Sequence, residues 1–319
     1  MFKDTTLLAG LFLFGLTSLY LWSLAIRRLR RDLPLLPFEP RPPVPWGLLA
    51  PLLFVGLFMS EAISVVVILG TEQMDLGVEN QSAGQLSAVL LVSSTTKLLY
   101  LIAVIVWLIR IVGATWKDLG WDVCHGWSDL ATGVCGFFML VAVVFSIQAV
   151  LSFVFEYEHP ILDLLEADET GHFFATAFFS AVVVAPLTEE FFFRVILQSW
   201  FENLAEKWKK WSESRDALTE PLPADGVTTT IEFDPQAETV AEAETDVIRC
   251  GAWWPIFASA LPFAAMHIGQ GPAPIPLFVL AIGLGYIYQR THRILPCIVV
   301  HSLLNGTSLL AFLAGGGAG

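Results

Sequence analysis

Long, uninterrupted apolar stretches are the feature that most constrains how this chain can fold. Eight of them can be marked, and most are about twenty residues long, the length of a helix that crosses the hydrocarbon core of a bilayer. They span residues 5–26, 46–70, 86–109, 130–154, 172–198, 251–270, 274–289 and 295–314. The strands of a membrane β-barrel alternate apolar and polar residues, and these stretches do not. The pattern predicts an all-α, polytopic membrane helical bundle with about eight transmembrane helices.

The composition agrees with a membrane protein. Of the 319 residues, 55% are hydrophobic and only 15% are charged, against about 25% charged in an ordinary soluble domain. The net charge of −13 is concentrated, because ten of the thirty acidic residues lie in 212–249, which we predict to be a flexible acidic insertion. The sequence has no basic stripe suited to nucleic acid. We therefore expect the partners to be the lipid bilayer and membrane-associated molecules, with no nucleic acid.

The distribution of positive charge predicts the orientation. A run of arginines at 27–31 follows the first apolar stretch, whereas the loops 71–85 and 155–170 contain no Lys or Arg. Cytoplasmic loops collect Lys and Arg. We therefore expect an integral membrane protein with both termini outside, in a bacterial plasma membrane.

Charged residues within membrane helices are costly, which makes them candidates for function. The fifth stretch contains two adjacent carboxylates, Glu189 and Glu190, followed by Arg194. Glu190 and Arg194 are four residues apart, so they share a helix face and can form an ion pair. Glu189 points about 100° away from Glu190 and is less naturally paired. One carboxylate is thus predicted to be structural and the other free to act as a general base.

Three further polar residues lie in the later stretches. His267 follows Phe263 by four residues, and His301 precedes Asn305 by the same spacing. A carboxylate, two imidazoles and an amide can together activate a water molecule and stabilise an oxyanion. The same Glu and His residues could instead bind a divalent metal that lowers the pKa of a bound water. The residues alone leave both alternatives open.

Taken in order, these three patterns resemble the motifs of a known family. The segments Glu189–Arg194, Phe263–His267 and His301–Asn305 are similar to the three motifs of the CPBP family. This family comprises the type II CAAX prenyl endopeptidases and the bacteriocin-processing proteins, and is also called the ABI family. The resemblance extends over about Trp116 to Ala314. We therefore predict N-terminal transmembrane helices with a proline-rich cytoplasmic loop over 1–115 and a protease core over 116–319.

The resemblance implies an intramembrane endopeptidase, similar to a CAAX protease, that cleaves a peptide bond of a membrane-associated protein or peptide. The implied roles are water activation by Glu189 and His267, oxyanion stabilisation by His301 and Asn305, a structural ion pair of Glu190 and Arg194, and packing of Phe263 beside His267. The family has been described both as metalloproteases and as glutamate proteases. The expected cofactor is therefore either a divalent metal such as Zn, with Glu189, His267 and His301 as candidate ligands, or none.

Two other functions fit parts of the sequence. A non-catalytic membrane scaffold or immunity protein could use the same fold. A transporter or proton relay would explain Lys97, Glu61 and Glu189 at membrane depth, but it predicts inverted repeats and none is visible. We expect Lys97 and Glu61 to form an interhelical pair, and we expect His292 to be solvated at a helix end.

The catalytic interpretation requires one arrangement that the apolar stretches do not provide. Their limits place Glu189 and His301 toward the cytoplasmic side and His267 toward the outer side. A shared site needs all three residues at one depth. We therefore expect the fifth helix to continue past Arg194 toward Trp208, and the sixth to be tilted or broken at Pro262.

Overall fold

The computed structural model describes residues 2–70, 83–155, 171–219 and 251–315, and within these ranges the regular structure is helical without β-strands. The described residues form eight continuous helical segments, in agreement with the predicted number. Four of them are regular α-helices before the central segment: α1 (Phe2–Leu29), α2 (Leu49–Gly70), α3 (Ala83–Trp107) and α4 (Gly126–Leu151). The last three are α10 (Trp254–Ala265), α11 (Pro274–Thr291) and α12 (Leu295–Gly315). The predicted all-α helical bundle is confirmed.

The central segment is one long helix that runs without a break from His172 to Thr219. It consists of α6 (His172–Phe178), a π-helical turn (Phe179–Val184), α7 (Ala185–Glu190), a second π-helical stretch (Phe191–Gln198) and α8 (Ser199–Thr219). This confirms that the fifth helix continues past Arg194. It also extends eight residues into the predicted acidic insertion, whose remaining part lies outside the described residues.

The lengths of the helices and the character of their surface are those of an integral membrane protein. The stretches Ala9–Leu29, Leu49–Ile68, Gly84–Val112 and Val123–Leu151 are each long and apolar enough to cross a bilayer. Large apolar side chains such as Leu19 cover the outward faces of these helices. Exposed apolar surface of this extent is stable only against lipid, so the chain is embedded in a membrane.

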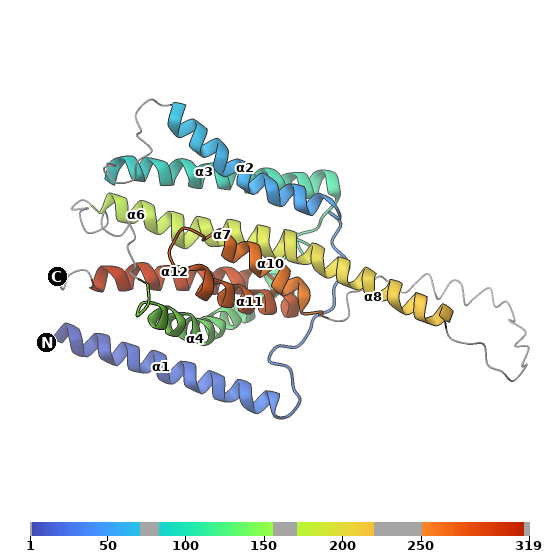
Figure 1. Ribbon diagram of the computed structural model, residues 1–319, viewed down its shortest axis with the longest axis horizontal. Helices are drawn as coiled ribbons and strands as arrows, with labels where there is room; N and C mark the ends of the chain where they lie inside the picture. The colour runs from blue at the N-terminus through green and yellow to red at the C-terminus, as the bar shows by residue number, and fades with distance from the viewer. Residues whose placement is uncertain (1, 71–82, 156–170, 220–250, 316–319) are drawn as a thin grey trace, which may run out of the picture.

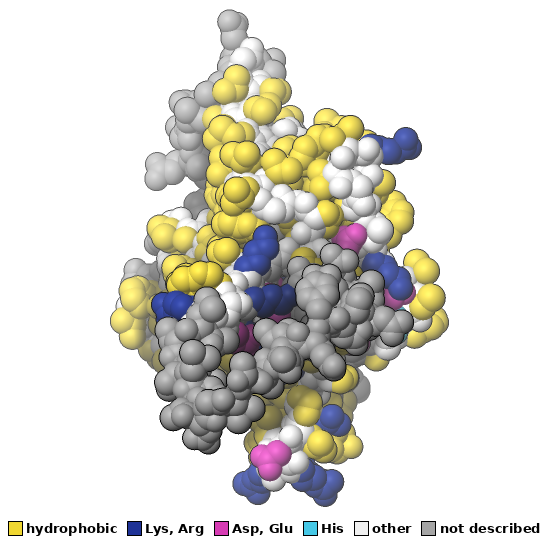
Figure 2. Space-filling model, turned by 90° about the vertical axis from the view of Figure 1, so that its right-hand side faces the viewer, with side chains coloured by type: hydrophobic (Ala, Val, Ile, Leu, Met, Phe, Trp, Pro, Cys, Tyr) yellow, Lys and Arg dark blue, Asp and Glu magenta, His cyan; other side chains and the backbone are white. Residues whose placement is uncertain are grey.

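The helices are arranged around the central segment (Figure 1). α1 lies at one edge and packs on α4, while α2 and α3 pair at the opposite edge. Both termini lie at one end of the bundle, and α8 projects from the other. Figure 2 views the end from which α8 projects and shows several clusters of Lys and Arg side chains there. This asymmetry is the one on which the predicted orientation depends.

The proline-rich connection between α1 and α2 is extended and is fixed to the end of the bundle by buried polar contacts. Nη2 of Arg41 donates to Glu202 over 3.0 Å, and Nε1 of Trp46 donates to the carbonyl of Ile196 over 3.3 Å. Nδ1 of His292 lies 2.8 Å from the carbonyl oxygen of Glu39. His292 is thus buried and not solvated as expected, and burial lowers its pKa.

α10 is much shorter than the apolar stretch 251–270 that predicted it. Its 12 residues give a length of about 18 Å, well below the roughly 30 Å of a hydrocarbon core. Turns over 266–273 follow, with Gly269 and Gly271 in left-handed conformations that glycine adopts without strain. α11 then packs back against α10, so that the two form a hairpin entering and leaving at the same end (Figure 1). His267, just past the end of α10, therefore lies inside the bundle and not at its outer end.

Candidate functional site

The central helix carries the first motif at the point where its two π-helical stretches flank α7. Nε of Arg194 lies 2.9 Å from Oε2 of Glu190, and both side chains are completely buried. This confirms the predicted ion pair between residues four apart. The second guanidinium nitrogen, Nη1, is 3.5 Å from the hydroxyl of Ser259 on α10, and the guanidinium lies over the ring of Phe263. Arg194 thereby connects the central helix to the hairpin.

Glu189 differs from its neighbour in exposure and in pairing. Its side chain is 14% exposed, whereas that of Glu190 is 0% exposed. The two carboxylates project in different directions, as a helix of 3.6 residues per turn requires. The structure therefore separates a fully paired carboxylate from one that remains accessible.

His301 joins the two carboxylates from α12. Its Nδ1 lies 2.8 Å from Oε1 of Glu190, and its Nε2 lies 4.0 Å from Oε2 of Glu189. The carboxylate of Glu190, already paired with Arg194, can only accept, so Nδ1 of the imidazole is the donor. This contact fixes the orientation of the ring and leaves Nε2 facing Glu189.

The second motif packs against the third through one aromatic ring. Phe263 is fully buried, and its ring centroid lies 5.4 Å from that of His267 and 5.7 Å from that of His301. Nδ1 of His267 lies 2.9 Å from the carbonyl oxygen of Phe263 and must therefore donate to it. Nε2 is then the available nitrogen of this half-buried imidazole. The expected packing of Phe263 beside His267 is present.

Asn305 lies one turn after His301 and contacts the central helix. Its Nδ2 donates to the carbonyl oxygen of Ala181 over 2.8 Å. Ala181 belongs to the π-helical turn Phe179–Val184, and a π-turn leaves main-chain groups without their usual α-helical partners. The bond uses one of the two amide hydrogens of Asn305.

A second charged pair lies close to this group. Nζ of Lys97 on α3 is 2.6 Å from Glu61 on α2, which confirms the predicted interhelical pair. The hydroxyl of Ser93 also donates to Glu61 over 3.0 Å. The accessible carboxylate of Glu189 faces the imidazole of His301 from α12.

The predicted metal ligands do not form a metal site in this arrangement. Within the described part of the chain, no three His, Cys, Asp or Glu side chains come close enough together to hold a metal ion. Among the candidate ligands, Oε2 of Glu189 lies 4.0 Å from Nε2 of His301. The arrangement of these donors in the described residues does not fit a bound metal ion.

Comparison with known families identifies the region that carries these residues. A family model described as type II CAAX prenyl endopeptidase Rce1-like matches residues 171–217 and 242–307. All three motifs lie inside the matched residues. This match supports the resemblance of the region to the CPBP family. The family that the model describes is one of CAAX-protease-like membrane endopeptidases that act on membrane-associated proteins. Nothing matches the chain among curated proteins or among solved structures.

Several residues of the site could not be identified from the sequence. Ser259 supports Arg194, and Gln198 bonds both Glu202 and the carbonyl oxygen of Gly285. Serine and glutamine are common in helices and carry no spacing signal of their own. The only available signal for Gln198 is its spacing of four residues from both Arg194 and Glu202, which places all three on one helix face.

Proposed function

We propose that this protein is an intramembrane endopeptidase in which Glu189 activates the water that attacks the peptide bond. The observation that carries the proposal is the position of Oε2 of Glu189, 4.0 Å from Nε2 of an imidazole that Glu190 holds in place. One water molecule can hydrogen-bond two atoms at this separation, because each bond is about 2.8 Å long. Glu190 is itself paired with Arg194, so Glu189 is the carboxylate available to take a proton.

In the proposed reaction, Glu189 removes a proton from water while the water oxygen attacks the carbonyl carbon of the substrate. Negative charge then develops on the carbonyl oxygen. Protonated Nε2 of His301 and the second amide hydrogen of Asn305 donate to this oxyanion. The proton held by Glu189 passes to the amine as the C–N bond breaks. His267 offers Nε2 as a further acceptor for the water, in the role that the family resemblance implies.

The experiment that tests this function compares new protein termini in membranes from cells expressing the wild type or Glu189→Gln at matched levels. Termini that appear only with the wild type support proteolysis and identify the substrate. Equal profiles with both proteins folded would favour a non-catalytic scaffold. A parallel arm treats purified wild type with a chelator, and unchanged cleavage is expected because no metal takes part in the proposed reaction.

Removing the amide of Asn305 is expected to slow the chemical step. Asn305→Ala deletes one oxyanion donor, for which a loss of about 10²–10³-fold in kcat is typical, with little change in KM. The measurement is a steady-state assay on the substrate identified above. Thr307→Ala on the same helix is the control, because its hydroxyl bonds only to the carbonyl of Leu303 in the described structure. An equal loss in both variants would contradict the proposal.

We also propose that the end from which α8 projects faces the cytoplasm. Cys124 is exposed at this end, just before α4. A membrane-impermeant thiol reagent is expected to label it in inside-out vesicles and not in intact cells. The protein used has Cys135, Cys250 and Cys297 replaced by Ser, so that the further substitution Cys124→Ser should remove the signal. Labelling of Cys124 in intact cells would reverse the proposed orientation.

A further inference from the structure

An apolar cavity lies between α1 and the rest of the bundle, apart from the candidate site. Its volume is about 760 Å³, and it is bounded by α1, the connection that follows α1, α4 and α11. Most of its lining is apolar, with Leu21 and Trp22 from α1, Leu140 from α4 and Ile287 from α11. None of the side chains assigned to the site lines it. The cavity is therefore a possible binding site that is separate from the candidate functional site.

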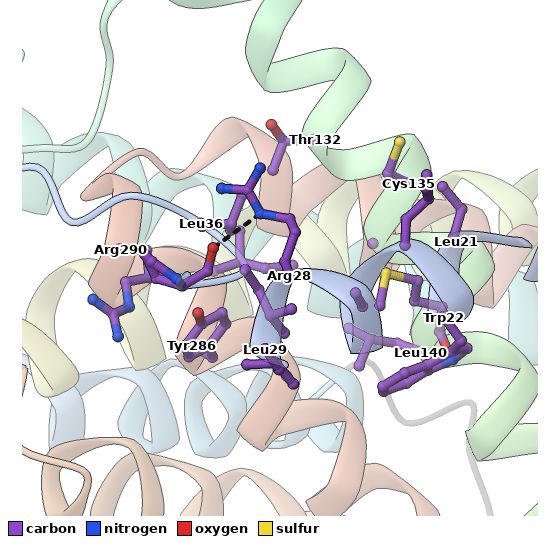
Figure 3. A pocket seen from close by; sticks show the side chains of 18 of the residues that line it. Leu21, Trp22, Arg28, Leu29, Leu36, Thr132, Cys135, Leu140, Tyr286 and Arg290 are labelled. Atoms are coloured by element: carbon purple, nitrogen blue, oxygen red, sulfur yellow. Dashed lines mark hydrogen bonds between the residues drawn. The ribbon is translucent and has the colours of Figure 1, made fainter. Parts of the chain in front are cut away.

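Two arginines border the cavity at its polar end. Figure 3 shows Arg28 and Arg290 together, with Tyr286 beside them, and Trp22, Cys135 and Leu140 farther along the cavity. Nε of Arg28 donates to the carbonyl oxygen of Pro34 over 3.1 Å. The guanidinium of Arg290 lies 5.3 Å from the centroid of the Tyr286 ring. Both arginines lie in the last turns of their helices, α1 and α11, which end on the side of the bundle from which α8 projects (Figure 1). Lipid headgroups lie at this level if the chain is embedded as described.

Arg28 is exposed and Arg290 is half-buried, and unlike the buried arginines neither has an acidic partner within the described residues. Arg41, Arg194 and Arg293 each pair with a carboxylate, of Glu202, Glu190 and both Glu39 and Asp129 respectively. Arg28 and Arg290 have no carboxylate partner within the described residues, and the buried Nε of Arg290 has no hydrogen-bond acceptor there. Two unpaired guanidinium groups at the mouth of an apolar cavity are complementary to a phosphate that carries acyl chains.

We propose that the cavity binds an anionic phospholipid from the surrounding membrane. Its phosphate lies between Arg28 and Arg290, and its acyl chain extends along the apolar wall toward Trp22 and Leu140. The distance from Arg28 back to Leu21 along α1 is about 10 Å, which orients the lipid roughly parallel to the helices. The lipid then fills the gap between α1 and the core and fixes α1 to α11.

The proposal is tested with purified protein in nanodiscs that contain equal amounts of dioleoylphosphatidylglycerol and dioleoylphosphatidylcholine. Native mass spectrometry after release measures which lipid stays bound. The wild type is expected to retain phosphatidylglycerol preferentially. Each arginine contributes about fivefold to this preference, from roughly 1 kcal/mol for a basic residue at an anionic surface. Arg28→Gln/Arg290→Gln should remove the preference.

Two controls distinguish specific lipid binding in the cavity from a general electrostatic attraction between basic residues and anionic lipid. Arg27→Gln/Arg31→Gln removes the same charge from the neighbouring basic run, and neither residue lines the cavity. It should keep the preference. Cys135→Trp places bulk in the cavity and should reduce bound lipid of both kinds, whereas Ala149→Trp, at an exposed position of the same helix, should not. Equal retention of the two lipids by the wild type, or equal loss in both arginine pairs, would overturn the proposal.

Discussion

Replacing Glu189 by glutamine is expected to lower the rate of peptide hydrolysis by about 10²–10⁴-fold, the usual contribution of a general base. Glutamine has the same size but cannot accept the proton of the attacking water. The side chain of Glu189 is partly exposed and has no ion pair within hydrogen-bonding distance in the described structure, so the folded state should lose little. The measurement is the cleavage rate of the identified substrate, alongside the unfolding temperature in the same detergent.

The neighbouring residue provides the matched comparison for this substitution. Glu190→Gln changes the same atoms one position along the helix, but in a completely buried side chain paired with Arg194. It is expected to reduce both activity and stability, whereas Glu189→Gln reduces activity alone. Wild-type cleavage by a folded Glu189→Gln variant would remove Glu189 from the proposed mechanism.

The largest effect on stability is expected from removing one partner of the buried ion pair between Glu190 and Arg194. Glu190→Gln leaves the guanidinium of Arg194 buried without a counter-charge, and arginine cannot lose its proton to compensate. Breaking a buried pair in this way typically costs about 3–5 kcal/mol. Thermal unfolding in detergent, followed by tryptophan fluorescence, measures the loss. The glutamine oxygen can still accept from Nδ1 of His301, but its amide nitrogen then faces the donor Nε of Arg194. The effect therefore reports the loss of the counter-charge together with this one hydrogen bond.

A second substitution shows whether the loss comes from the unpaired charge. In Glu190→Gln/Arg194→Met the buried guanidinium is also replaced by an apolar chain, which removes the uncompensated charge. The double variant should recover much of the unfolding free energy lost in the single variant, while hydrolysis stays impaired. If the two substitutions simply add, Arg194 is not destabilised by the loss of Glu190, and the pair is not a coupled unit.

The helices could be predicted because each depends on local sequence. An apolar stretch of about twenty residues in a membrane must form a helix, because only then are its backbone hydrogen bonds satisfied within the segment. The predicted segment 274–289, for example, corresponds closely to α11. The ion pair of Glu190 with Arg194 was equally local, since both residues belong to one turn. The pair of Lys97 with Glu61 could be predicted from the free-energy cost of burying a charge in a membrane helix. Two opposite charges in adjacent apolar helices lower this cost by pairing with each other.

What the sequence could not predict depends on how distant segments meet. The contact of His301 with Glu190 joins residues more than a hundred positions apart. Nothing in either motif specifies whether the imidazole hydrogen-bonds Glu189 or Glu190. The same holds for His292, which is buried because the proline-rich connection folds over it and places the carbonyl of Glu39 against its ring. The π-helical stretches beside α7 could not be predicted either, because no pattern in the apolar sequence distinguishes them from α-helix.

The early end of α10 has a consequence for how water reaches the candidate site. Residues 268–271 follow it as turns and are exposed in the structure. Non-helical backbone at bilayer depth is stable only where protein covers it or water solvates it. The hairpin therefore requires a hydrated recess where its tip meets the lipid. That recess begins one residue from His267, so the interruption that keeps this helix from crossing the membrane also gives water a route to the residues of the proposed reaction.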